Sequence, residues 1–77
     1  MNIKQFIKDF AAEFELTEPE DIIADTVYRD LDEWDSLLGL SIIGMVNNKY
    51  HVQISGVEVR NVKTVEDLFN LVKSKQA

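Results

Sequence analysis

Apolar residues recur at three- and four-residue steps near the N-terminus, which is the spacing of an amphipathic helix. Asn2 precedes this pattern and is a residue type that caps helix N-termini. The apolar face contains Ile3, Phe6, Ile7, Phe10 and Phe14. The polar face contains Lys4, Lys8, Asp9 and Glu13. The pattern predicts a first helix whose aromatic stripe lies in the core rather than in a partner groove.

A second helical pattern covers residues 36–50, and Asp35 and Ser36 before it both suit a helix start. The expected apolar stripe contains Leu37, Leu40, Ile43 or Gly44, and Val46 or Asn47, with Ile42 and Met45 widening it towards Tyr50. Gly39 and Gly44 lie inside this helix, each at a cost of about 1 kcal/mol relative to alanine. Gly44 falls near the Leu37–Ser41 face, which is interpreted either as a flat contact surface for a partner or as a helix-packing face.

The segment between these two patterns has no single period. Pro19 ends the first helical pattern, because proline is excluded from helix interiors and restricts the residue before it. Apolar residues that suit core anchors follow it, namely Ile22, Ile23, Val27, Tyr28 and Leu31. We expect a long loop that is pinned to the core and contains a short helical turn, and long loops in compact domains are often functional.

Two capping patterns mark the C-terminal third of the chain. Ser55 and Glu58 have capping-box spacing and predict a short helix over residues 56–60 that ends at Asn61. Thr64, followed by acids, predicts a last helix. Its buried face is expected to contain Val65, Leu68, Phe69 and Val72. Residues 51–54 are β-prone but have no second strand to pair with, so we interpret them as a connector. The predicted fold is all-α, with a single domain over residues 1–77.

Charge is unevenly distributed along a chain of 77 residues with a net charge of −6. Eleven acids and three bases leave −8 in residues 1–35, whereas three acids and five bases leave +2 in residues 36–77. Nucleic acid is not an expected partner, because phosphate binding needs a basic face. No apolar run approaches the ~20 residues of a membrane span, and the N-terminus lacks the apolar core of a secretory signal. We therefore expect a cytoplasmic protein that does not insert into membranes.

Few catalytic or metal-binding arrangements are compatible with the composition. Cysteine is absent, which excludes disulfides and thiolate metal sites. Ser36 would need a base to act as a nucleophile, but the only histidine, His51, would lie roughly 22 Å away along the helix. The acidic run from Asp30 to Asp35 lacks the glycine and glutamate of an EF-hand, so a solvated loop is expected and calcium binding is kept only as an alternative. We predict a protein that carries or binds something, not an enzyme.

Ser36 has two interpretations at the start of a helix. It either caps the free backbone N–H groups of the first turn, or it presents its hydroxyl for a phosphate ester, since a helix N-terminus favours anions.

The order of elements resembles the acyl carrier protein family over essentially the full chain. The resemblance is carried by Asp35-Ser36-Leu37 at the head of an apolar helix, after a long loop and before a short third helix, and by Thr64-Val65-Glu66-Asp67-Leu68 in the fourth helix. It implies a four-helix bundle of the acyl-carrier-protein type, with a long loop between helices 1 and 2 and a short helix 3. It further implies that a phosphopantetheinyl transferase, with its own magnesium, attaches 4′-phosphopantetheine from coenzyme A to Ser36.

The resemblance also implies a function for the attached arm. Its terminal thiol supplies the sulfur that the chain lacks and holds acyl groups as thioesters. The loaded protein shuttles them between acyl-loading, condensing and acyltransferase-type enzymes, as in fatty acid biosynthesis. Asp35 and Leu37 would be recognised by the transferase.

The second helix differs from the family pattern. Carriers of fatty acid synthesis commonly line it with glutamates, but no acid lies between Leu37 and Tyr50. We therefore expect a discrete, monomeric carrier in a specialised pathway. Trp34 is expected to pack the loop onto the core, with a partner contact as the alternative.

The resemblance also implies residues for partner contact and for an acyl cavity. The predicted partner-facing residues are Asp35, Leu37, Leu38, Ser41 and Met45. The residues proposed to line an acyl cavity, with ordinary core packing as the alternative, are Ile42, Val46, Ile54 and Val62. Two alternative functions stay open: an unmodified helical adaptor that binds a partner through this surface, and an aminoacyl or D-alanyl-type carrier.

Overall fold

The computed structural model describes residues 1–76, and its regular secondary structure is helical. Its α-helices are α1 (Ile3–Ala11), α2 (Ser36–Tyr50), α3 (Gly56–Asn61) and α4 (Val65–Lys75). Two 3-10 turns, η1 (Pro19–Asp21) and η2 (Tyr28–Asp30), lie between α1 and α2. No β-strand is present in these 76 residues, where Val27 and Thr64 form an isolated antiparallel bridge. The predicted all-α class is confirmed, and α2 has the predicted limits.

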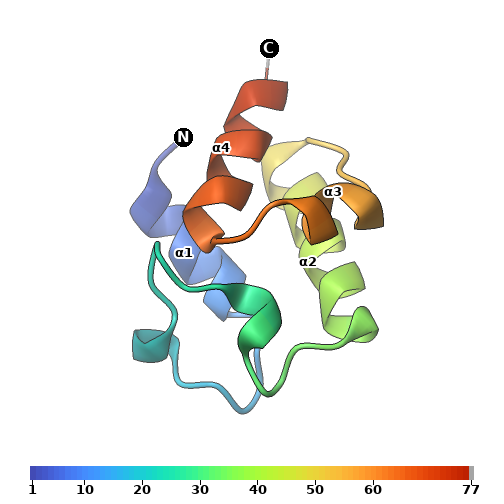
Figure 1. The fold of residues 1–77 in the computed structure, drawn as a ribbon. Helices are drawn as coiled ribbons and strands as arrows, with labels where there is room; N and C mark the ends of the chain where they lie inside the picture. Colours follow the sequence, from blue (N-terminus) through green and yellow to red (C-terminus); the bar gives the residue numbers. More distant parts are fainter. Residues whose placement is uncertain (77) are drawn as a thin grey trace.

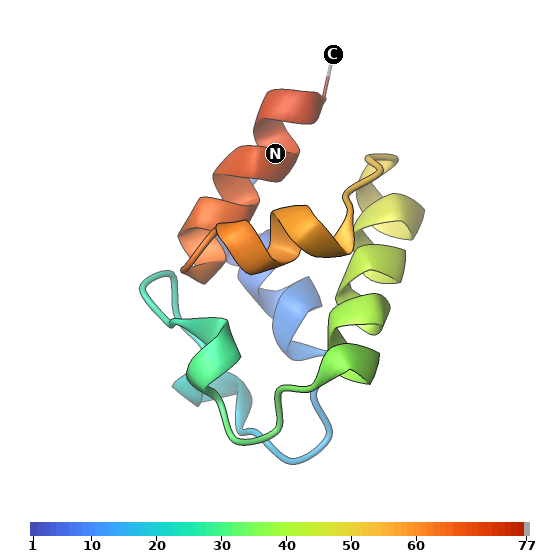
Figure 2. The same cartoon turned by 45° about the vertical axis from the view of Figure 1, so that its right-hand side comes forward.

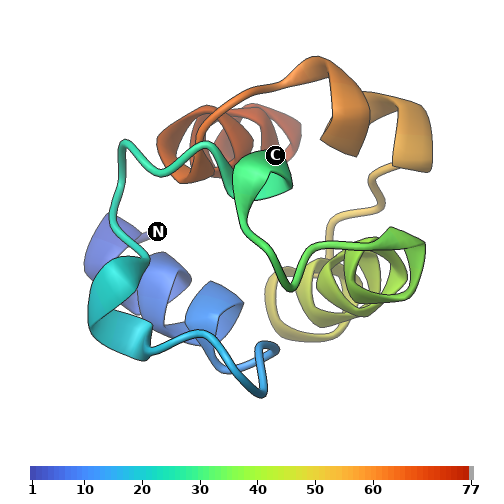
Figure 3. The same ribbon diagram turned by 60° about the horizontal axis from the view of Figure 1, so that its bottom comes forward.

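The helices pack so that α1 contacts both α2 and α4, while α3 contacts α2 (Figure 1). The short α3 crosses between α2 and α4 (Figure 2). The segment that carries η1 and η2 extends across one end of the helices before it enters α2 (Figure 3). The start of α2 therefore lies beside this segment.

A capping side chain begins each helix. Asn2 Oδ1 accepts hydrogen bonds from the backbone N–H of Lys4, at 2.8 Å, and of Gln5. Ser55 forms the capping box expected at α3, and Thr64, expected only as a cap, forms a capping box with Asp67 at α4. These local signals explain why the helix starts match the prediction, because a cap satisfies backbone donors that the helix itself leaves free.

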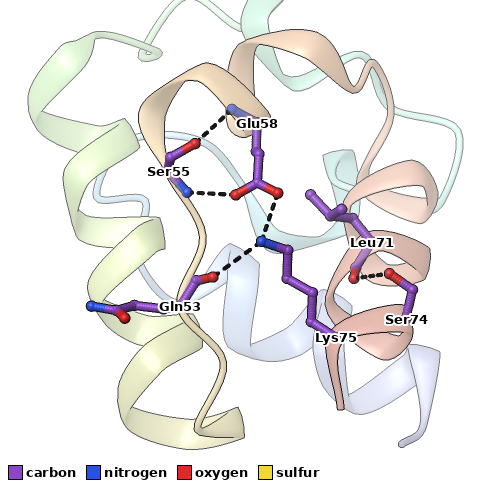
Figure 4. Close-up of polar contacts among 6 residues, drawn as sticks. All are labelled: Gln53, Ser55, Glu58, Leu71, Ser74 and Lys75. Atoms are coloured by element: carbon purple, nitrogen blue, oxygen red, sulfur yellow. Dashed lines mark hydrogen bonds and ion pairs between the residues drawn. The ribbon is translucent and has the colours of Figure 1, made fainter. Parts of the chain in front are cut away.

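Glu58 of the first box also joins α3 to the end of α4. Its carboxylate accepts from Lys75 Nζ at 2.6 Å and from the Ser55 backbone N–H at 3.0 Å (Figure 4). Lys75 donates a second bond to the Gln53 carbonyl at 3.3 Å. The Lys75 bond is the main reason that the pKa of Glu58 lies below its ordinary value. This contact holds the connector before α3 against the last turn of α4.

Aromatic rings form the centre of the core. The Phe6 ring lies 5.6 Å from the rings of both Tyr50 and Phe69, and Phe10 lies 5.6 Å from Tyr28. The predicted buried face of α4 is confirmed, since its four residues, Val65, Leu68, Phe69 and Val72, are all buried. The aromatic stripe of α1 is therefore core, as the spacing indicated.

Asp9 corrects the predicted polar face of α1, because its side chain is buried and only 7% of the residue is exposed. Its carboxylate accepts hydrogen bonds from Gln5 Nε2 at 2.9 Å, Tyr50 Oη at 2.5 Å and Lys49 Nζ at 3.4 Å. Desolvation alone would raise the pKa of Asp9, but these donors outweigh it and hold the pKa below its ordinary value. Asp9 thus joins α1 to the end of α2, a contact that helical spacing does not reveal.

The buried face of α2 also differs from the predicted stripe. Its core residues are Leu38, Ile42, Met45 and Val46. Leu37 and Leu40 are instead 74% and 64% exposed. Because this helix is apolar on most sides, its hydrophobic period does not define one face. The neighbouring elements decide which face is buried.

The segment between α1 and α2 is attached to the core as expected, with one exception. Ile22 and Tyr28 are buried, but Ile23 is exposed, since adjacent residues in extended backbone point to opposite sides. The carbonyls of Ala24 and Thr26 accept the first backbone N–H groups of α4, at 2.9 and 3.1 Å. No helix in residues 1–76 is long and apolar enough to span a membrane.

Candidate functional site

Ser36 is the first residue of α2 and is exposed. Asp35, not Ser36, is the N-cap: its Oδ1 accepts the backbone N–H of Leu38 at 2.8 Å. Within residues 1–76 the Ser36 hydroxyl makes no hydrogen bond. The interpretation of Ser36 as the cap is therefore wrong, and its hydroxyl faces solvent at a helix start.

Glu33 holds the residues directly before Ser36 in place. Its carboxylate accepts the backbone N–H groups of Glu15, Leu16 and Thr17 at 2.7, 2.9 and 2.8 Å, and the Thr17 hydroxyl at 2.9 Å. Desolvation would raise the pKa of Glu33, but these donors lower it below its ordinary value. The carboxylate thus ties the residues before α2 to the segment that follows α1.

Trp34 packs the same residues, directly before α2, onto the core, as predicted. Its ring lies 4.9 Å from that of Tyr28 and 6.4 Å from that of Phe14, measured between centroids. On its other side is Gly39, where a Cβ atom would lie 3.4 Å from the indole. The glycine therefore lets the indole sit close against the first turns of α2.

A pocket of about 550 Å³ lies beside Ser36, between α2 and α3. Part of its lining comes from Arg29 of η2 and from three consecutive residues at the start of α2, Trp34, Asp35 and Ser36. The two helices contribute Gly39, Leu40 and Ile43 from α2, and Gly56, Val59 and Arg60 from α3. Its volume is in the range of small-molecule sites, which is about 300–1,000 Å³.

The predicted cavity residues do not line this pocket. Ile42, Val46 and Ile54 are buried in the core, and Val62 is half-buried. The reason is the orientation of α2, which places Ile43 and its neighbours, and not Ile42, on the side that faces α3. This corrects the residues of the predicted cavity.

The predicted partner-facing residues divide into two groups. Asp35, Leu37 and Ser41 are exposed. Leu38 and Met45 are core residues, at 8% and 5% exposure, so neither is available on the surface. The prediction for these two residues is corrected for the same reason: α2 buries the face on which they lie.

Arg29 and Arg60 also line the pocket, and no sequence pattern predicted a role for them. They are 31 positions apart, so no local pattern links them. Tyr28 and Val59, the residues directly before them, are joined by a hydrogen bond from the phenol to the Val59 carbonyl. The one available signal was their residue type, because these are the only arginines in the chain.

The rest of the described surface has fewer features of a binding or catalytic site. A second pocket of about 540 Å³ lies between α1 and η1, is lined in part by Lys4 and Lys8, and contains no helix-start hydroxyl. In the described residues, no three His, Asp or Glu side chains are grouped to hold a metal ion. His51 is exposed and ends α2 in a left-handed conformation, at φ 57°.

No family model, curated protein or solved structure matches this chain. Its function is therefore inferred from the site itself and from the family resemblance of Asp35-Ser36-Leu37 described above.

Proposed function

We propose that this chain is an acyl carrier protein whose Ser36 carries 4′-phosphopantetheine and which shuttles thioester-bound acyl groups between enzymes of a specialised pathway. The observation that supports this most is the exposed, unbonded Ser36 hydroxyl at the first residue of α2. A serine that served as a cap would have its oxygen occupied, but here Asp35 takes that role. Ser36 is thus accessible to a modifying enzyme.

In the proposed modification, the Ser36 oxygen forms a bond to the phosphorus that bears the pantetheine of coenzyme A. The bond from that phosphorus to the bridging oxygen breaks, and the nucleotide half of coenzyme A leaves with the other phosphate. The hydroxyl proton passes to a base of the transferase. The start of α2 favours the resulting phosphodiester, because helix N-termini favour anions. When bound, the arm supplies the thiol that holds the acyl group.

The arrangement of elements is compatible with a bundle of the acyl-carrier-protein type. The apolar α2 begins at Ser36, after a long segment with two 3-10 turns, and the short α3 lies beside it. Asp35, Leu37 and Ser41 are exposed around the attachment residue and form our proposed contact surface for the transferase and the acyl-handling enzymes. We propose that the carrier is a cytoplasmic monomer.

Intact mass measurement tests the modification directly. After incubation with coenzyme A and a broad-specificity phosphopantetheinyl transferase, the wild type should gain the mass of one phosphopantetheine. Ser36→Ala should gain nothing. Ser74→Ala, which removes an exposed serine hydroxyl in α4 outside the proposed contact surface, should be modified like the wild type. A wild type that never gains this mass would overturn the proposed function.

Leu37→Ala separates recognition from folding. The side chain is 74% exposed, so its truncation should change the free energy of unfolding by less than about 0.5 kcal/mol. We expect slower modification at an unchanged melting temperature. A large loss of stability would contradict the placement of Leu37 on the surface.

An unmodified helical adaptor is the second candidate, because Leu37, Leu40 and Val57 are large apolar side chains exposed near the pocket. An adaptor would form a stable complex that persists in Ser36→Ala. A carrier would lose its acyl-dependent exchange with enzymes in the same variant. The two functions are therefore distinguished by one substitution.

A further inference from the structure

Both arginines of this chain line the pocket that contains Ser36. The other six bases are lysines, and none of them lines this pocket. Arg29 comes from η2 and Arg60 from α3, so two separate elements each bring one guanidinium to the same place. In a chain with a net charge of −6, this local excess of positive charge is unusual.

The segments that carry the two arginines are joined to each other. The hydrogen bond from Tyr28 to the Val59 carbonyl joins the residues that directly precede them. Arg60 folds back along α3, and its Nη1 lies 3.6 Å from where a Cβ atom on Gly56 would be. This distance places the guanidinium over the first turn of α3, within ordinary van der Waals contact of that position.

Neither guanidinium is neutralised by an acidic side chain within residues 1–76. The ion pairs found there are Lys49–Asp9 and Lys75–Glu58. Among the pocket residues, two guanidiniums and the carboxylate of Asp35 leave a formal charge of +1. One oxygen of that carboxylate already caps α2. Within residues 1–76, the two guanidiniums thus make no ion pair or side-chain hydrogen bond, although the chain has 14 acids.

We infer that Arg29 and Arg60 bind an anionic group that arrives with the arm on Ser36, an inference that rests on the proposed function. A planar guanidinium offers paired donors that match the oxygens of a carboxylate or a phosphate. Two sources have this chemistry: the phosphodiester of the arm itself, and the free carboxylate of a dicarboxylic acyl group. The apolar side chains of Leu40 and Ile43 line the same pocket and suit the methylene part of such a group.

The same charge acts against the aminoacyl alternative. An aminoacyl thioester carries an ammonium group, which the two guanidiniums repel and only Asp35 attracts. A dicarboxylic half-thioester meets the opposite balance. The pocket therefore selects for negatively charged cargo.

The arginine side-chain N–H signals in NMR spectra test this inference, because the chain has only two arginines. Arg29→Gln and Arg60→Gln assign the two signals. Spectra are compared for the apo form, the holo form, and holo forms loaded with pentanoyl or glutaryl groups, which have chains of equal length. A shift between apo and holo identifies the phosphodiester as the bound anion. A shift with glutaryl but not with pentanoyl identifies the carboxylate.

Matched variants provide the second measurement. If the bound anion stabilises the fold, the form that carries it should melt at a higher temperature than the form that lacks it. Arg60→Gln should remove most of this gain. Lys8→Gln, which removes one positive charge at the second pocket, should retain it.

Each failure has a distinct meaning. Normal loading by intact mass, with arginine signals that are the same in all four forms, overturns this inference and leaves the carrier function intact. Failure of the wild type to load overturns both. A loss of the melting gain in Lys8→Gln equal to that in Arg60→Gln would show a general charge effect and would also overturn the inference.

Discussion

Asp9 and Tyr50 form a contact whose strength depends on one charge. The Tyr50 hydroxyl donates to the buried Asp9 carboxylate, while the tyrosine ring packs 5.6 Å from that of Phe6. Tyr50→Phe removes the hydroxyl and keeps the ring. Because hydrogen bonds to charged groups contribute about 1.5–3 kcal/mol, we expect a loss of that size at neutral pH. Urea unfolding should show a lower midpoint and an unchanged slope.

This loss should depend on pH in a predictable direction. The folded state holds the pKa of Asp9 below its ordinary value of 3.8, so the stabilisation is complete above that value. It disappears as the pH falls through the folded pKa, and the difference between wild type and Tyr50→Phe should shrink with it. Tyr28→Phe is the control, since Tyr28 donates to a neutral carbonyl and burial raises its pKa to about 12. Equal pH dependence in both variants would contradict the role of Asp9.

Local signals in the sequence identified single residues better than long-range ones did. Asn2, Ser55 and Thr64 were predictable as caps because each acts on backbone groups two or three positions away. Burial of Asp9 was not predictable, since its partner Tyr50 is 41 positions away and nothing local marks the pair. The convergence of the two pocket arginines was hidden for the same reason.

At the scale of elements, Gly44 lies inside α2, where a glycine is less favourable than an alanine. A Cβ atom on this residue would meet nothing within 4 Å, so alanine fits without a clash. Glycine inside a helix costs about 1 kcal/mol relative to alanine, and Gly44→Ala should raise the melting temperature by about 4–8 °C. Gly39→Ala should gain less, because its Cβ would lie 3.4 Å from the Trp34 ring. A variant Gly44→Ala that melts below the wild type would contradict this account.

The same helix shows why an element can be predicted while its orientation cannot. Its start was predicted from the capping residue types at Asp35 and Ser36, and its end at Tyr50 was predicted from the extent of the apolar pattern. Its buried face depends on what packs against it. Leu37 and Leu38 are equally apolar, and only the positions of α1 and α3 decide that Leu38 is buried and Leu37 is exposed. The position of Ser36 at the start of α2 was therefore predictable, but the pocket beside it was not.

At the scale of the whole molecule, charge repulsion is the main electrostatic effect. Residues 1–35 carry a net charge of −8, and the described residues contain two ion pairs, Lys49–Asp9 and Lys75–Glu58. Ten of the eleven acids in residues 1–35 lie between Glu13 and Asp35, in the segment that joins α1 to α2. Screening by salt should remove more repulsion than attraction, so salt should stabilise this fold.

The length of the molecule determines the salt range over which this stabilisation occurs. The molecule is 33 Å in its longest dimension, comparable with the Debye length of about 30 Å at 0.01 M salt. At 0.15 M the length is about 8 Å, and most acids no longer repel across the molecule. The melting temperature should therefore rise between these concentrations and then level off. A variant with Glu18→Gln and Asp25→Asn, both exposed in the acidic half, should show a smaller rise, whereas Lys73→Gln should show a larger one. A melting temperature that falls with added salt would mean that the two ion pairs outweigh the repulsion among the acids.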